Sequence, residues 1–155
     1  MLIAAQPQAG CLLINTNSHV GMQYRDKMLD YARQRAIEAL KITQRAVLAT
    51  SGPAGVQATE FPCEARGLEL YLLVPQTSDH LFNLEHVSTV TVLTTQWELK
   101  GEAQIISSIT TDLALNILRE PGAKWSRLVR VRPCKLQILK EEGWGNLETL
   151  DINSR

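Results

Sequence analysis

The sequence predicts a mainly β protein with flanking helices, in which short strands form a small barrel. The main observation is a series of strand-like segments between residues 45 and 106, interrupted by one helical segment. The strand-like segments are RAVLAT (45–50), a polar-alternating segment ending at Glu64, LELYLLV (68–74), TVTVLTT (89–95) and ELKGEAQII (98–106), and the helical segment is TSDHLFNL (77–84). A tight turn, SGPAG, follows the first strand. Several short strands around one helix are typical of small barrels, and small barrels carry pockets.

The last strand-like segment, which begins with LVRVRP, changes the face of its apolar residues along its length. Val129 and Val131 lie on one parity, whereas Leu136 and Ile138 lie on the opposite one. Proline has no backbone N–H to donate to a neighbouring strand. We therefore expect a β-bulge or a strand break near Pro133, because either would return the apolar side chains to the interior on both sides.

Two further helices are predicted outside the strand series. The first covers residues 26–41 and the other begins at residue 110 or 111 and ends before the Pro-Gly pair at 121–122. The apolar stripe of the first helix consists of Leu29, Ala32, Ala36 and Leu40. Because the first 25 residues show no period, we expect an N-terminal arm over residues 1–25 and a single barrel domain over residues 26–155.

Composition argues against several classes of function. The chain has 155 residues, enough for one domain with a full core, and its 16 basic and 16 acidic residues cancel. A neutral chain has no net field that would attract nucleic acid or a membrane surface, and no apolar run approaches the ~20 residues of a membrane span. The cysteines form no CxxC pair and the histidines show no metal-ligand spacing, so we expect free thiols, no metal site and a cytoplasmic location.

Taken together, these segments resemble the pyridoxamine 5'-phosphate oxidase-like FMN-binding split barrels. The resemblance is carried by AVLAT-SGPAG, SDHLFNL, TVTVL, WELKGEA, LVRVRP and EGWGNLETLDI, in this order, over residues 26–152. It implies a six-stranded split β-barrel that forms a homodimer and binds FMN in a cleft between the subunits. It also implies a flavin-dependent oxidoreductase that acts on a small molecule, while the residues identify neither the substrate nor a general base.

The resemblance places the FMN phosphate at the start of the helix after the third strand, where free backbone N–H groups and the helix dipole favour an anion. Ser78, His80 and Lys100 would approach this phosphate, with Asn83 on the same helix and Arg127 among the arginines able to supply a cation. Flavin-binding members usually carry Lys or Arg where His80 stands. A branch linked to haem utilisation has His there, followed by an Asn-Leu pair, as here. The alternative is that Ser78 only caps the helix and His80 is a surface residue.

The same resemblance implies that Thr59, Glu60 and Phe61 line the flavin ring. Trp97 stands at a strand end, where an aromatic side chain can wall the ring because it offers a large flat area and one N–H donor. The alternative for Trp97 is a position in the core or at a subunit interface.

A second function stays open: a non-catalytic split-barrel dimer that binds haem, another cofactor or a protein partner. It is favoured by the scarcity of phosphate ligands. The third strand ends in Val74 and Pro75 instead of hydroxyl residues, and Asp79 and Glu60 add negative charge where FMN needs cations. Flavin absorbance of the purified protein would support the first function. A Soret band, or colourless protein that FMN titration leaves unchanged, would support the second.

Overall fold

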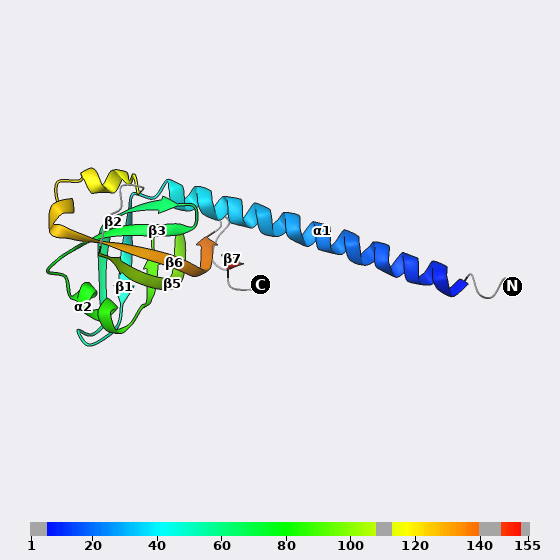
Figure 1. Ribbon diagram of the computed structural model, residues 1–155, viewed down its shortest axis with the longest axis horizontal. Coiled ribbons are helices and arrows are strands. Elements are labelled where there is room, and N and C mark those ends of the chain that lie inside the picture. Colours follow the sequence, from blue (N-terminus) through cyan, green and yellow to red (C-terminus); the bar gives the residue numbers. More distant parts are fainter. Residues whose placement is uncertain (1–5, 108–112, 140–146, 153–155) are drawn as a thin grey trace. The chain divides into compact units, whose positions relative to one another are not determined.

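The computed structural model describes residues 6–107, 113–139 and 147–152, and the chain divides into two compact units, Met1–Gln34 and Arg35–Arg155. Helix α1 covers Gln6–Lys41. Its residues up to Gln34 are the described part of the first unit, and its last residues, from Arg35, belong to the second unit. Figure 1 shows α1 as one continuous helix, coloured blue to cyan. Within the described residues, no helix combines the length and the apolar character that a bilayer crossing requires.

Helix α1 begins at Gln6, well before its predicted start near residue 26. The predicted start was wrong because it depended on an apolar stripe, which the earlier residues lack. Those residues contain no proline after Pro7, and proline is tolerated in a first helical turn, where its N–H would be unpaired in any case. At the other end, the predicted stripe is only partly confirmed: Ala36 and Leu40 are fully buried, Ala32 is half-buried and Leu29 is exposed. The predicted division at residues 25 and 26 falls inside α1.

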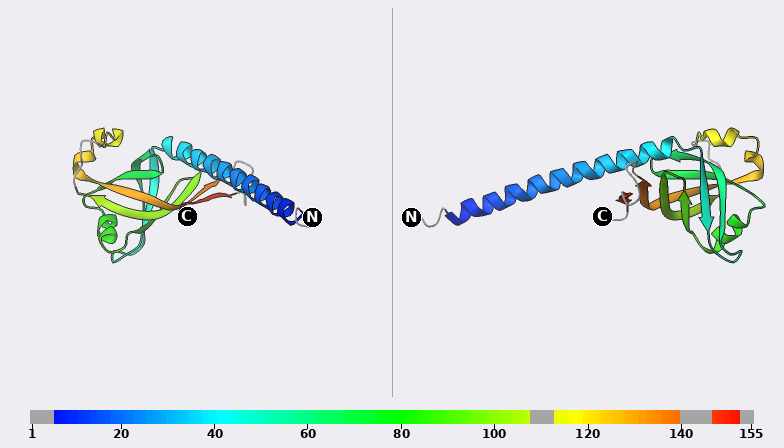
Figure 2. Two further views of the ribbon diagram at one scale, coloured as in Figure 1. Left: turned by 45° about the vertical axis from the view of Figure 1, so that its right-hand side comes forward. Right: turned by 180° about the vertical axis from the view of Figure 1, so that it is seen from behind.

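The second unit is one antiparallel sheet that closes on itself around a common interior (Figures 1 and 2). Its strands are β1 (Arg45–Thr50), β2 (Gln57–Arg66), β3 (Glu69–Pro75), β4 (Thr89–Leu93), β5 (Trp97–Ile106), β6 (Ser126–Leu139) and β7 (Leu147–Asp151). Their order is β3-β2-β1-β4-β5-β6-β7, and an additional pairing of β3 with β6 closes the barrel. The predicted six-stranded split β-barrel is therefore confirmed, with β7 added beside the C-terminal half of β6.

Strand β6 joins three neighbours. Its first half pairs with β3 and its second half with β7, while β5 follows almost its full length. The register with β5 skips Cys134, so this residue forms a β-bulge beside Pro133. The bulge confirms the expectation drawn from the change of parity, because Val131 and Leu136 are both buried although they lie on opposite parities.

Aliphatic side chains fill the barrel interior, and a second apolar cluster covers the outside of the β3–β6 seam. Fully buried interior side chains include Leu48, Leu70, Leu72, Val74, Val92, Leu99, Val129 and Val131. The outer cluster consists of Tyr71, Leu73 and Leu128 from the strands, with Leu115 and Ile117 from the segment between β5 and β6. This cover explains why β3 is buried on both faces and reads as a continuous apolar run.

The third predicted helix is wrong in its described part. Its expected start lies outside the described residues, and from residue 113 the chain forms two short 3-10 helices, η2 (Asn116–Arg119) and η3 (Ala123–Trp125). Leu115 and Ile117 both pack into the outer cluster. Two residues that are two positions apart do not lie on one face of an α-helix, so an α-helix here could not bury both. Backbone–side-chain bonds fix the segment on β2: Arg66 donates to the carbonyl of Ala114, and Glu64 accepts from the N–H of Ile117 at 3.1 Å.

Candidate functional site

Two of the predicted site residues, Ser78 and Arg127, line the same pocket. The pocket lies where β3 leads into helix α2 (Asp79–His86), at one end of the barrel (Figure 1). Ser78 caps α2, because its Oγ accepts a hydrogen bond from the N–H of His80 at 3.3 Å. Ser78 and Arg127 line one pocket of about 630 Å³, which we call the rim pocket. Its other walls are Gln76, Thr77, Asp79, Leu81, Phe82, Glu85 and Ile105. Arg127 reaches the pocket because β6 begins opposite the end of β3.

The rim pocket contains the donors of an anion site, but its charge is unfavourable. The hydroxyl groups of Thr77 and Ser78 and the guanidinium of Arg127 can all donate to phosphate oxygens. The carboxylates of Asp79 and Glu85 line the same pocket. Among the described residues that form these walls, cations are therefore outnumbered by anions. A dianionic phosphate would need a further cation from elsewhere, such as a second subunit.

His80 lies inside the protein, not on the rim pocket. Its side chain is 2% exposed, its Nδ1 lies 2.8 Å from Oγ1 of Thr50, and its Nε2 lies 3.0 Å from Oγ1 of Thr59. Its ring packs against Phe61 in a T-shaped arrangement, with the ring centroids 5.3 Å apart. Burial lowers the pKa of His80, so the ring is neutral near pH 7. This placement corrects the alternative that His80 lies on the surface, and it leaves His80 outside the pocket that Ser78 and Arg127 line.

Asn83 is also fully buried, and it joins α2 to the turn between β1 and β2. Its Oδ1 accepts from the N–H of Ala54 at 2.9 Å, and its Nδ2 donates to the carbonyl of Gly55 at 2.9 Å. The same Nδ2 donates to Oγ1 of Thr50 at 3.1 Å. Asn83 therefore acts on the backbone of the turn and, like His80, does not line the rim pocket.

The hydrogen-bond network defines the tautomer of His80. The amide of Asn83 is oriented by one backbone donor and one backbone acceptor, so Nδ2 must be the group that faces Thr50. Thr50 accepts from Asn83 and can donate its own hydrogen to Nδ1 of His80. Nε2 then carries the ring proton and donates it to Thr59. We assign the Nε2–H tautomer on this basis, because it leaves each donor in the chain with an acceptor.

The three residues expected to line a flavin ring do not share one face. Thr59 contacts a ring nitrogen of His80 and Phe61 packs against the same ring. Glu60 faces the other side of β2 and pairs with Arg45, its carboxylate 3.7 Å from the guanidinium. Glu60 and Phe61 both contribute to a second pocket, of about 300 Å³, along β1, β2 and β3. In one subunit these residues therefore do not form a single wall.

Trp97 and Lys100 lie away from the rim pocket. Trp97 is 1% exposed, and its indole N–H donates to Oγ1 of Thr43 at 3.1 Å, before the start of β1. Thr50 ends that strand, so Trp97 is roughly 20 Å from His80 at the usual rise of about 3.3 Å per residue. Its burial agrees with the core alternative. Lys100 is exposed opposite Thr91, whereas the rim pocket borders β5 at its other end.

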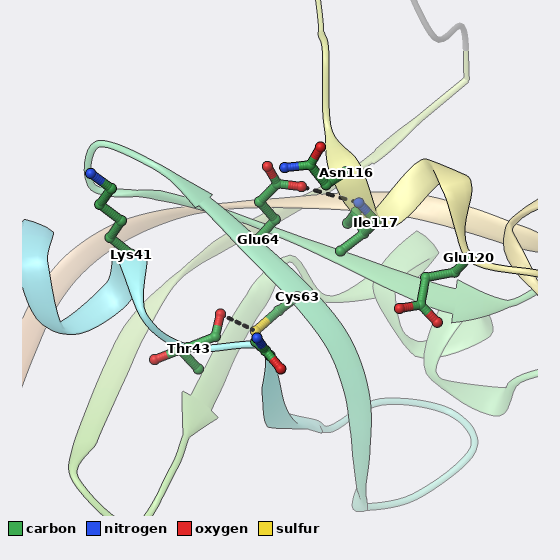
Figure 3. Close-up of a pocket in the computed structure, with 8 residues that line it drawn as sticks. Lys41, Thr43, Cys63, Glu64, Asn116, Ile117 and Glu120 are labelled. Atoms are coloured by element: carbon green, nitrogen blue, oxygen red, sulfur yellow. Dashed lines mark hydrogen bonds between the residues drawn. The ribbon is translucent and has the colours of Figure 1, made fainter.

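Figure 3 shows a third pocket, of about 380 Å³, beneath the η2 segment. The thiol of Cys63 faces it and contacts the carbonyl of Thr43 at 3.8 Å. Burial raises the pKa of this thiol to about 12, so no thiolate forms near neutral pH. Glu64 is bonded to η2 and lies 3.2 Å from Arg66. The described residues contain no group of three or more His, Cys, Asp or Glu placed to hold a metal ion.

Sequence reasoning missed Thr50. Thr50 has a signal in the sequence, because it shares the parity of Ala46 and Leu48 in RAVLAT and must therefore face inward. A polar side chain at an inward position predicts a buried hydrogen-bond partner. Thr77 directly precedes Ser78 in the segment where the phosphate was expected, and the structure places it in the rim pocket with Arg127 from β6.

No protein-family model matches this chain, and no curated protein matches its sequence. Solved structures do match. General stress protein 26 from Bacillus anthracis is 18% identical, with a TM-score of 0.59, covering 76% of this chain and 97% of that one. A protein of the pyridoxinephosphate oxidase family from Clostridium acetobutylicum, related to general stress protein 26, is 11% identical with a TM-score of 0.55, covering 81% and 95%.

A haem binding protein from Mycobacterium smegmatis is 19% identical, with a TM-score of 0.58, covering 77% of this chain and 57% of that one. Identities this low establish the arrangement of the backbone and leave the ligand undetermined. The closed barrel, the helix after its third strand and these superpositions agree with one another. This chain therefore has the split-barrel fold of the pyridoxamine 5'-phosphate oxidase-like proteins.

Proposed function

We propose that the protein binds FMN at the rim pocket, as a homodimer, and acts as a flavin-dependent oxidoreductase on a small molecule. The observation that carries this proposal is the meeting of Ser78 and Arg127 in one pocket at the start of α2. The pocket volume lies within the ~300–1,000 Å³ range of small-molecule and cofactor sites. The structural neighbour from the pyridoxinephosphate oxidase family has the fold to which the sequence resemblance attributes FMN binding.

Each residue of the rim pocket has a definite part in this proposal. Thr77 and Ser78 would donate hydroxyl hydrogen bonds to the phosphate, and Arg127 would donate a charge-assisted pair. A bound flavin supplies the electron-transfer chemistry, and the chain supplies its position. Asp79 and Glu85 oppose the phosphate charge, and in this proposal a cation of the second subunit compensates for them.

The two acids in the rim pocket count against a phosphate there, and one structural neighbour is a haem binding protein, so a non-catalytic split barrel that binds haem is the second candidate. His80 could not serve as an iron ligand without losing its bonds to Thr50 or Thr59. His86 is better arranged, because it is exposed and donates its Nδ1–H to the carbonyl of Phe82 at 3.0 Å. That bond leaves Nε2 as the lone-pair nitrogen, which is the arrangement of many metal-bound histidines.

Titration of the purified protein with FMN, followed by flavin fluorescence, tests the first proposal. Arg127→Ala should weaken FMN binding roughly 10- to 100-fold, because it removes a charge-assisted contact worth about 1.5–3 kcal/mol. Asp79→Asn should strengthen binding, since it removes a like charge from the same pocket. Lys100→Ala is the matched control, because it removes an exposed cation that lies outside the pocket.

Three results would reject the first proposal: no saturable FMN binding by the wild type, equal losses for Arg127→Ala and Lys100→Ala, or weaker binding for Asp79→Asn. A Soret band that shifts from the position of free haem when the protein is added, and that no longer shifts with His86→Ala, would instead support the second candidate. The homodimer is tested separately by sedimentation at micromolar concentration, where the mass should be twice that of the 17.3 kDa chain.

A further inference from the structure

Helix α2 is too short to hold its own position. It has 8 residues, and an isolated helix of about two turns does not persist in water. Its place therefore depends on its buried face, which consists of His80, Leu81, Asn83 and Leu84. Leu81 and Leu84 contribute apolar burial, which is not directional and tolerates small rotations and shifts. The hydrogen bonds of the polar pair, His80 and Asn83, do depend on direction.

The polar pair anchors α2 to two strands and to one turn. His80 reaches Thr50 at the end of β1 and Thr59 on β2, while Asn83 binds Thr50 and the backbone of the turn. These bonds cannot all be kept if α2 rotates or slides by even 1 Å or so, because hydrogen bonds weaken steeply outside their usual distances and angles. We call the set formed by Thr50, Thr59, His80 and Asn83 the polar clamp.

The turn is also packed tightly against the clamp. A Cβ added to Gly52 would lie 2.8 Å from Oδ1 of Asn83 and 3.1 Å from its Cα. Only glycine leaves room for this approach, so the turn and α2 are in direct contact through Asn83. The β1–β2 turn and the helix therefore move together.

The rim pocket begins immediately next to the clamp. Ser78 and Asp79 line the pocket, and the following residue, His80, belongs to the clamp. Ser78 itself accepts the N–H of His80, so any displacement of His80 reaches the pocket wall directly. We propose that His80 and Asn83 are positioning residues, which hold the first turn of α2 where Thr77, Ser78 and Arg127 can bind one anion. The identity of the anion rests on the proposed FMN function, but the positioning does not.

The first arm of the test measures FMN affinity in Asn83→Ala and in His80→Ala. Both should bind FMN at least about tenfold more weakly than wild type, although neither residue lines the pocket. His80→Gln should recover most of the loss, because its amide can still donate to Thr59. Leu136→Ala is the stability control, since Leu136 is buried in the interior beside β7, away from α2.

Affinity is compared at a temperature where every variant is folded. An Asn83→Ala affinity within twofold of wild type would overturn the positioning role. So would an equal affinity loss in Leu136→Ala, because that would show a general effect of lowered stability.

The second arm uses amide hydrogen exchange without any ligand and separates the two proposals. Asn83→Ala should speed exchange at least tenfold in residues 51–56 and 78–84, relative to β4 and β5 in the same sample. Leu136→Ala should not produce this local pattern. If wild type fails to bind FMN but the local pattern appears, the clamp stands and the FMN proposal fails. If exchange in both segments is unchanged, the clamp is rejected whatever the FMN result.

Discussion

Gly101 should not tolerate any side chain, and Gly101→Ala tests the bulged register of β5 and β6. An ideal Cβ at this position would lie 3.0 Å from the carbonyl carbon of Arg132 and 3.0 Å from Cα of Pro133, and closer still to the carbonyl oxygen of Arg132. All three neighbours are backbone atoms at the bulge, so no side-chain rotation can relieve the contact. The two strands must separate or the register must change.

The expected cost follows from this geometry. Overpacking a well-packed site costs about 1–3 kcal/mol, and a backbone clash lies at the upper end. Replacing glycine also reduces the conformational entropy of the unfolded chain, which stabilises the folded protein by about 0.4–1 kcal/mol. The net loss should be about 2–3 kcal/mol, which lowers the melting temperature by roughly 5–10 °C for a chain of this size.

Thermal unfolding followed by far-UV circular dichroism measures the effect. Gly122→Ala is the matched control, because no atom lies within 4 Å of its added Cβ and its φ of −83° suits alanine. The control should stay within about 0.5 kcal/mol of wild type. A Gly101→Ala melting temperature within about 2 °C of wild type would refute the bulged register.

Three further predictions concern the interior. Trp97→Phe should cost about 1–2 kcal/mol in urea unfolding, because it removes the indole bond to Thr43, and an unchanged free energy would place the indole elsewhere. The free energy of unfolding should fall as the pH drops below about 6.5, because His80 takes up a proton in the unfolded state but not when it is buried. This fall should be smaller in His80→Gln, and parallel stability–pH profiles of the variant and the wild type would contradict the burial of His80. Iodoacetamide at pH 8 should label Cys63 only after unfolding, as read by peptide mass mapping, and rapid native labelling would contradict its raised pKa.

Sequence alone captured the features that depend on local pattern. Parity along the last strand, together with Pro133, was enough to place the bulge. The start of α1 was missed because a helix without an apolar stripe has no periodic signal. The orientation of His80 was missed for a different reason: its partner Thr50 is 30 residues away, and only the folded sheet brings the two together. The same holds for Arg127 and Ser78, which reach one pocket because the start of β6 lies beside the end of β3 although the two residues are far apart in the sequence.

The strand that closes the barrel, β6, is made late in synthesis. Until it leaves the ribosome, β3 pairs only with β2, and its other edge, carrying the run LYLLV, has no strand beside it. An unpaired apolar edge of this kind readily pairs with other chains. The nascent protein therefore passes through a stage in which it is an open, adhesive sheet, and its yield in the cell should depend on chaperones that cover β3 until β6 arrives.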